Sequence, residues 1–238
     1  MVSSNAEVIS GIVMVQLVKP RTPILSNAFV FPQNMRTGAP GFGRIGISLF
    51  NVMYNQMWRG FYNIPTMFGS SGMGASKFID YQLGYEKSIS TVLTAISGAS
   101  IINYVGGVTG ELSHHPVLSV MDNDVAGMIG RFMEGVEVTP ATLALDLIEK
   151  VGPSPGFFLG VQHTRDWWAK EQYVPEASDQ LTHLEWEVAG KKSALDYAKE
   201  QVEEILANYE HTLSPDKDAE LDRILDEARE YYRKKDLL

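Results

Sequence analysis

Four aromatic residues near the ends of predicted strands could hold a small organic cation. They are Phe29, Phe31, Phe68 and Tyr104, and strand ends are where α/β folds place their chemistry. The carboxylates Asp80 and Glu86 lie in and near the first turns of the helix predicted at 79–97. Ring faces attract a quaternary ammonium through cation–π contacts. Each residue also has a simpler interpretation, because Asp80 could cap a helix, Glu86 could form an ion pair on a helix face and aromatic rings usually pack in a core.

Glycines follow two of these strands: Gly69, Gly72 and Gly74 come after the strand that ends at Phe68, and Gly106 and Gly107 after the strand that contains Tyr104. Backbone N–H groups at the start of the next helix could cradle an anion. However, GSSGMG lacks the Lys-Ser/Thr ending of a P-loop and does not match the dinucleotide fingerprint. Since glycine has no side chain, these loops favour close approach of a ligand or partner to the backbone.

The histidines predict no metal site. His114 and His115 are adjacent, so they do not share a helix face, and the chain has no cysteine for a thiolate site or a disulfide. His163 follows the last predicted strand, which suits a functional histidine. Because no carboxylate partner is visible in the sequence, structural burial of His163 is the competing interpretation.

The elements that must position these residues alternate between helix and strand. Such alternation predicts parallel strands with helices outside, because a parallel crossover needs a dozen or more residues. The pattern fits both an open sheet and half of a (β/α)8 barrel, of which open sheets are the more common. The predicted strands are 22–31, 66–68, 100–105 and 157–160, and the predicted helices are 5–18, 44–62, 79–97, 116–135 and 139–151.

Charge divides the chain into residues 1–175 and an acidic helical extension, residues 176–238. The extension has 17 acidic and 9 basic residues, whereas the first part has 12 and 11. Apolar residues recur in the extension at helical spacing, which predicts a helical pair packed on the body or on a partner, with a solvated acidic face.

Composition also narrows the function classes. The net charge of −9 and the lack of a basic stripe exclude a nucleic-acid partner. No apolar run approaches the ~20 residues of a membrane span, and residues 1–20 do not read as a signal peptide. We therefore expect a cytoplasmic protein.

Several segments resemble the trimethylamine methyltransferase family, which includes pyrrolysine-containing trimethylamine enzymes and relatives without pyrrolysine that act on glycine betaine and similar quaternary amines. Order and spacing agree across nearly all of residues 5–175. The matching segments are NAEVISGIVMVQLVKPRTPI, MRTGAPGFG, SKFIDYQLGYEK and GVEVTPATLALDLIEKVGPSPGFFLGVQHT.

The resemblance implies a TIM (β/α)8 barrel that moves a methyl group from a methylamine to the Co(I) of a corrinoid on a separate protein. Family members are about twice as long, so the chain resembles their C-terminal half. The expected fold is then a C-terminal half-barrel with parallel strands and outer helices, plus the helical extension. An N-terminal-half chain or a second copy of this chain is the expected partner, beside the corrinoid protein.

The resemblance also extends the predicted site. Gln82 joins Asp80 and Glu86 in the family pattern D-x-Q-x-G-Y-E, while Arg36 and His163 lie in other matching segments. The loop from Gly69 to Lys77 lies where some members carry pyrrolysine, and its standard residues argue against trimethylamine and leave a quaternary amine or no substrate. No catalytic step is assigned to any residue. The predicted substrate-binding residues are Phe68, Asp80, Gln82, Glu86, Tyr104, His163 and Arg36, and the predicted corrinoid-facing residues are Gly69, Gly72, Gly74, Lys77, Gly106 and Gly107.

Two functions follow from these patterns. The first is a methyltransferase, or a subunit of one, acting on a quaternary or tertiary methylamine. The alternative is a non-catalytic half-barrel that serves as a binding or assembly module. Both predict association, because a half-barrel has an open sheet edge and an apolar inner face that free monomers avoid.

Overall fold

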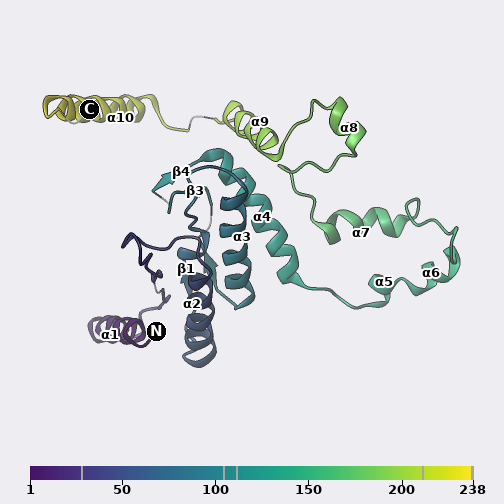
Figure 1. The fold of residues 1–238 in the computed structure, drawn as a ribbon, viewed down its shortest axis with the longest axis horizontal. Coiled ribbons are helices and arrows are strands. Elements are labelled where there is room, and N and C mark those ends of the chain that lie inside the picture. Colours follow the sequence, from purple (N-terminus) through teal and green to yellow (C-terminus); the bar gives the residue numbers. More distant parts are fainter. Residues whose placement is uncertain (28, 104, 111, 211, 237–238) are drawn as a thin grey trace. The chain divides into compact units, whose positions relative to one another are not determined.

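The computed structural model describes residues 1–27, 29–103, 105–110, 112–210 and 212–236. Helices dominate the described chain, and its strands are short (Figure 1). The chain divides into two compact units, Met1–Val202 and Glu203–Leu238. The boundary predicted at residue 175 rests on a change in composition and stays a prediction.

The first unit holds most of the elements, and α9 crosses into the second. Its helices are α1 (Val2–Val18), α2 (Ile45–Asn55), the π-helix η1 (Gln56–Phe61), the short 3₁₀-helix η2 (Ser70–Gly72), α3 (Tyr81–Ile96), α4 (Pro116–Glu134), α5 (Pro140–Leu143), α6 (Leu145–Val151), α7 (Gln162–Gln172), α8 (His183–Val188) and α9 (Ala194–Ala207). Its strands are β1 (Met67–Phe68), β2 (Ile101–Ile102), β3 (Gly107–Val108) and β4 (Ser113–His114). The second unit contains α10 (Pro215–Lys234).

Strands β1 and β2 are parallel, as the alternating pattern predicts. Met67 pairs with Ile101 and Phe68 with Ile102, and α3 makes the crossover between the strands. In the described residues of the predicted strand 22–31, the pairing is reduced to a parallel bridge between Ser26 and Thr66. The described chain therefore has an α/β-like arrangement, while the expected half-barrel stays a proposal.

The predicted strand at 157–160 is wrong. These residues form no strand, and the side chains of Phe157 and Leu159 are 68% and 70% exposed. An apolar run becomes a strand only where a neighbouring strand accepts its backbone hydrogen bonds. The antiparallel hairpin of β3 and β4 was not predicted, because GV and SH carry no apolar alternation that would mark a strand.

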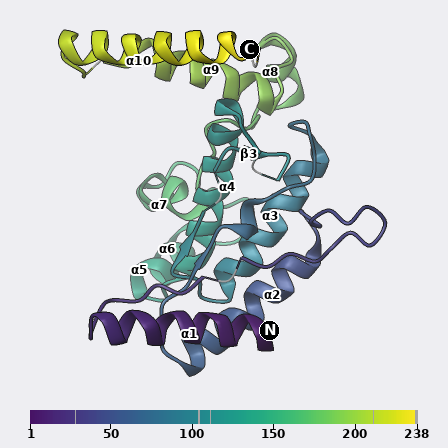
Figure 2. The ribbon, with the colours of Figure 1, turned by 90° about the vertical axis from the view of Figure 1, so that its left-hand side faces the viewer.

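Helices α2, α3 and α4 lie side by side (Figures 1 and 2). The rings of Tyr54 in α2, Trp58 in η1 and Phe68 in β1 form a fully covered cluster, with Tyr54 stacked on Trp58 and edge-on to Phe68. Val8 and Ile12 of α1 pack against this cluster. The aromatic cluster thus packs β1 against α2 and η1.

Buried polar side chains join α2 to α3. Asn51 donates to Thr94 Oγ1 at 3.2 Å, and Asn55 donates to Ser97 Oγ at 2.7 Å. Ser70 of η2 also donates to Asn51 Oδ1, at 3.2 Å. Because buried polar groups need specific partners, these bonds fix how α3 is rotated against α2.

No helix in the described part of the chain is both long enough and apolar enough to cross a bilayer.

Candidate functional site

Helix α3 begins at one of the predicted site residues. Asp80 is its N-cap, and its Oδ1 accepts hydrogen bonds from Leu83 N at 2.9 Å and from Ser76 Oγ at 3.0 Å. The capping interpretation of Asp80 is therefore confirmed. The side chain is also exposed, so a substrate role for its charge stays open as a prediction.

Glu86 lies in the second turn of α3 and is only 8% exposed. Its Oε2 accepts from Ala75 N at 2.6 Å and from Ser76 N at 3.3 Å, and its Oε1 accepts from Gln82 Nε2 at 2.8 Å. Its partners are thus N–H groups rather than the cation that a helix-face ion pair would need. The carboxylate fastens the loop after β1 onto α3.

Two glycines pack directly against this carboxylate. A Cβ at Gly43 would lie 2.3 Å from Cδ of Glu86, and one at Gly74 would lie 3.1 Å from Oε2 of Glu86 and 2.5 Å from Cδ1 of Leu83. Gly43 also has φ +68°, which disfavours other residues. Within this chain, these glycines allow the loops to approach α3 closely.

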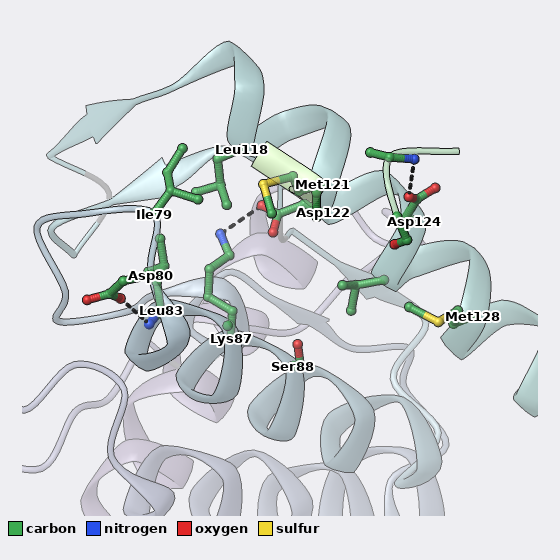
Figure 3. Close-up of a pocket in the computed structure, with 15 residues that line it drawn as sticks. Ile79, Asp80, Leu83, Lys87, Ser88, Leu118, Met121, Asp122, Asp124 and Met128 are labelled. Carbon is green, nitrogen blue, oxygen red and sulfur yellow. Dashed lines mark hydrogen bonds and ion pairs between the residues drawn. The ribbon is translucent and has the colours of Figure 1, made fainter. Parts of the chain in front are cut away.

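The residue after Glu86 forms a buried ion pair. Nζ of Lys87 lies 3.0 Å from Oδ2 of Asp122 on α4, and the two side chains are 1% and 4% exposed (Figure 3). Lys87 donates to the carbonyl of Gly107 at 3.2 Å, and Asp122 Oδ2 accepts from Gly106 N at 2.7 Å. The pair links two helices to the backbone that follows β2.

Neither member of this pair was among the predicted site residues. Lys87 lies four residues after the buried Leu83 and seven before the buried Thr94, so the helical period puts it on the covered face of α3. Asp122 lies four residues after the buried Leu118. A charged residue on an otherwise covered helix face was the signal that could have found both.

A cavity of about 140 Å³ lies between α3, α4 and residues 177–178 (Figure 3). It is smaller than the ~300–1,000 Å³ typical of ligand pockets. Asp124 at its edge accepts hydrogen bonds from Glu176 N at 2.9 Å and Ala177 N at 2.7 Å. The carboxylates that line this cavity therefore brace the chain. The lining includes Leu83, Lys87, Leu118, Met121, Asp122, Asp124, Val125 and Met128.

The other predicted substrate-binding residues are spread over several elements. Phe68 is fully covered within the aromatic cluster that it forms with Tyr54 and Trp58. Arg36 lies on an exposed turn, where its backbone N–H donates to Asn34 Oδ1 at 3.1 Å. Tyr104 lies outside the described residues. Among the members of this set that the structure describes, only Asp80, Gln82 and Glu86 are brought together, on the N-cap and first two turns of α3.

His163 lies in α7 and is partly buried. Its Nε2 is 2.8 Å from the carbonyl oxygen of Ala141, and its ring stacks on Trp167 with centroids 5.8 Å apart. These contacts agree with the structural interpretation of this histidine, and its predicted role toward a substrate stays a prediction.

Most of the predicted corrinoid-facing glycines are covered by their own chain. Gly72, Gly74, Gly106 and Gly107 are buried, whereas Gly69 is partly exposed. Lys77 is exposed, and its Nζ donates to the carbonyl of Ala75 at 2.7 Å. Approach of a corrin to this set stays a prediction, which Gly69 and Lys77 fit most directly.

Burial perturbs two tyrosines in this unit. It raises the pKa of Tyr54 above the usual value of a tyrosine. Burial also raises the pKa of Tyr173, and the nearby carboxylates of Asp124 and Glu176 raise it further. In the described residues, no three His, Asp or Glu side chains are grouped to hold a metal ion.

Comparison with known proteins identifies relatives along almost the whole chain. The family profile described as trimethylamine methyltransferase (MTTB) matches residues 1–232. The chain is 34% identical to the glycine betaine methyltransferase of Desulfitobacterium hafniense over 91% of this chain and 45% of that relative. It is 30% identical to the trimethylamine methyltransferase MttB of Methanosarcina barkeri over 98% of this chain and 46% of that relative. The chain thus spans less than half the length of these relatives.

Proposed function

This chain belongs to the trimethylamine methyltransferase family, and from that premise we propose that it works in transferring a methyl group from a methylated amine to a corrinoid on a separate protein. The observation that carries the proposal is the family match across residues 1–232, together with relatives named as methyltransferases at 28–34% identity. The alternative of a non-catalytic module is not favoured by this match.

The half-barrel is part of the same proposal. The crossover from β1 through α3 to β2, with the parallel bridge from Ser26 to Thr66, supports it, because strand–helix repeats build a (β/α)8 barrel. A closed barrel needs eight strands. An N-terminal-half chain, or a second copy of this chain, would supply the remaining strands of the barrel.

A quaternary amine is the proposed substrate class. Residues 69–77 are all standard amino acids, and the relative at 34% identity is named for glycine betaine. A quaternary amine leaves as a neutral tertiary amine, so the protein need not supply a proton to it. Its tasks are to hold the cation, orient one methyl group and exclude water.

In this chain the first two turns of α3 carry the residues suited to holding a cation. Asp80 offers an exposed carboxylate, and Gln82 and Glu86 add a hydrogen-bonded amide and carboxylate. Arg36 and His163 complete the proposed substrate-binding set from other elements. The corrinoid of the partner protein would accept the methyl group, and Gly69 and Lys77 are the proposed residues nearest to it.

The proposal is tested by mixing the purified full chain with a candidate N-terminal-half chain and a corrinoid protein. Size-exclusion chromatography with light scattering first shows whether a complex forms. Loss of Co(I) absorbance is then followed with glycine betaine or trimethylamine as methyl donor. We expect faster methyl transfer from glycine betaine, and an assembled complex that demethylates neither these nor other quaternary amines would contradict the proposal.

Asp80→Asn separates charge from capping at the proposed cation site. Asparagine caps helices as well as aspartate does, so the variant should keep its stability. If the Asp80 charge holds the cation, KM for glycine betaine rises about tenfold, the equivalent of ~1.4 kcal/mol. Asp146→Asn, which removes an exposed charge from the first turn of α6, serves as the control, and an unchanged KM in Asp80→Asn would remove Asp80 from the site.

A further inference from the structure

The buried ion pair between Lys87 and Asp122 has a use beyond joining α3 to α4. Charges are rarely buried unless they are paired and hydrogen-bonded, because leaving water is unfavourable for each ion. Here both side chains are almost fully covered and 3.0 Å apart. Both also bind the backbone of one short segment, at Gly106 and Gly107.

That segment needs outside support. It connects parallel strand β2 to the hairpin of β3 and β4, and Gly106 turns the chain with φ +78°. A Cβ at Gly106 would lie 2.2 Å from Nε2 of His114 and 2.4 Å from Oγ of Ser119, so the turn is closely packed. Its buried N–H and C=O groups require hydrogen-bond partners.

The ion pair supplies those partners from both sides. Asp122 Oδ2 accepts from Gly106 N at 2.7 Å, and Lys87 Nζ donates to Gly107 O at 3.2 Å. Because one carboxylate oxygen contacts both the ammonium and the Gly106 amide, moving either helix would disturb the turn. An apolar pair could fill the same volume, but it would not orient a peptide group.

We propose that Lys87 and Asp122 are positioning residues, which hold the turn at Gly106–Gly107 and thereby set how the chain enters β3. Glu86, the neighbour of Lys87, similarly fastens the loop that follows β1. One turn of α3 therefore holds backbone that comes after each of two successive parallel strands, at the strand ends where α/β folds bind their ligands. The link to methyl transfer rests on the proposed function.

Hydrogen exchange of the full chain tests the positioning role without any substrate. In the variant Lys87→Met/Asp122→Leu we expect the Gly106 amide to exchange at least tenfold faster, relative to the amides of α3. The control Asn51→Leu/Thr94→Val breaks another buried polar contact of α3, which does not involve the turn. It should leave exchange at Gly106 unchanged relative to α3.

Equal protection of Gly106 in the wild type and in Lys87→Met/Asp122→Leu would overturn the proposal. So would equal loss of protection in the control variant. If the double variant fails to fold, Asp122→Asn replaces it, since this change keeps an oxygen acceptor but removes the charge that pairs with Lys87. Here we expect about threefold faster exchange at Gly106, and an unchanged rate would contradict the proposal.

The catalytic consequence is measured in the assembled complex with glycine betaine. If the turn shapes the reacting geometry, the Lys87 and Asp122 variants lower kcat about tenfold and leave KM unchanged. Faster exchange with an unchanged kcat would overturn the link to catalysis. A wild-type complex without activity would contradict the proposed function. It would leave the positioning role of Lys87 and Asp122 intact, because hydrogen exchange measures that role without any substrate.

Discussion

The ion pair of Lys87 and Asp122 and the ion pairs of Arg223 use the same chemistry in opposite surroundings. The side chains of Lys87 and Asp122 are 1% and 4% exposed, whereas Arg223 on α10 is 54% exposed and contacts Glu220 and Glu227, which are 55% and 64% exposed. Water and salt screen the exposed ion pairs of Arg223 strongly and the buried pair of Lys87 and Asp122 weakly. The buried pair therefore constrains the fold, and the exposed pairs mainly keep a helix surface solvated.

The largest expected effect comes from breaking the buried pair on one side. Asp122→Ala removes the carboxylate that lies 3.0 Å from the buried Lys87 ammonium, and removing one side of a buried ion pair costs about 3–5 kcal/mol. Urea unfolding followed by circular dichroism measures this loss. A loss below 1 kcal/mol would mean that the pair is no more important than an exposed one.

A matched pair of glycines tests how firmly the Glu86 carboxylate is held. Gly43 and Gly98 both have positive φ, but a Cβ at Gly43 would overlap Glu86 while Gly98 has open space around it. Overpacking adds about 1–3 kcal/mol to the backbone strain common to both positions. Gly43→Ala should therefore lose that much more free energy of unfolding than Gly98→Ala.

Glu86→Ala compares a buried carboxylate with its exposed neighbour. The change leaves the amides of Ala75 and Ser76 without their acceptor, which costs about 1–3 kcal/mol. Gln82→Ala, on the exposed side of the same turn, should stay within ~0.5 kcal/mol of wild type. Urea midpoints that are equal for the two variants would contradict the buried role of Glu86.

The loss of folding stability at alkaline pH tests the burial of Tyr54, a side chain that is neutral at pH 7. Burial raises the pKa of Tyr54 in the folded protein above its value near 10 in the unfolded chain. The contribution of neutral Tyr54 to folding stability is therefore fully present below pH 10. It is lost as pH rises through the higher pKa of the folded state. Tyr54→Phe cannot ionise, so its stability should decline less between pH 10 and 12. A pH titration of the urea midpoint measures this, and identical alkaline slopes would show that Tyr54 does not contribute.

The smallest effect is expected at the exposed pairs. Hydrogen bonds with Arg223 lower the pKa of Glu220 in the folded protein. The contribution of this ion pair to folding stability is therefore present above the usual pKa of a glutamate, and it is lost as pH falls through the lowered pKa. Arg223→Ala should leave the urea midpoint unchanged at neutral pH and in 1 M salt. A marked loss would mean that α10 depends on these pairs, and the contrast with Lys87 would fail.

The sequence alone determined the features that depend on local order. Helices α2, α3 and α4 follow from apolar residues at helical spacing, and the cap at Asp80 follows from its place before that pattern. Family membership was also readable, because several short segments in register are specific where any single motif is weak. Periodic patterns and caps need only neighbours within a few residues, so one sequence is enough to see them.

Only the tertiary structure decided which residues meet across the chain. Asp122 reaches Lys87 and the Gly106 amide because α4 packs on α3, and no local rule links these positions. The apolar run at 157–160 failed as a strand for the converse reason, since no neighbouring strand pairs with it. Local preference selects an element, but the partner that buries a charge or completes a strand depends on the path of the whole chain.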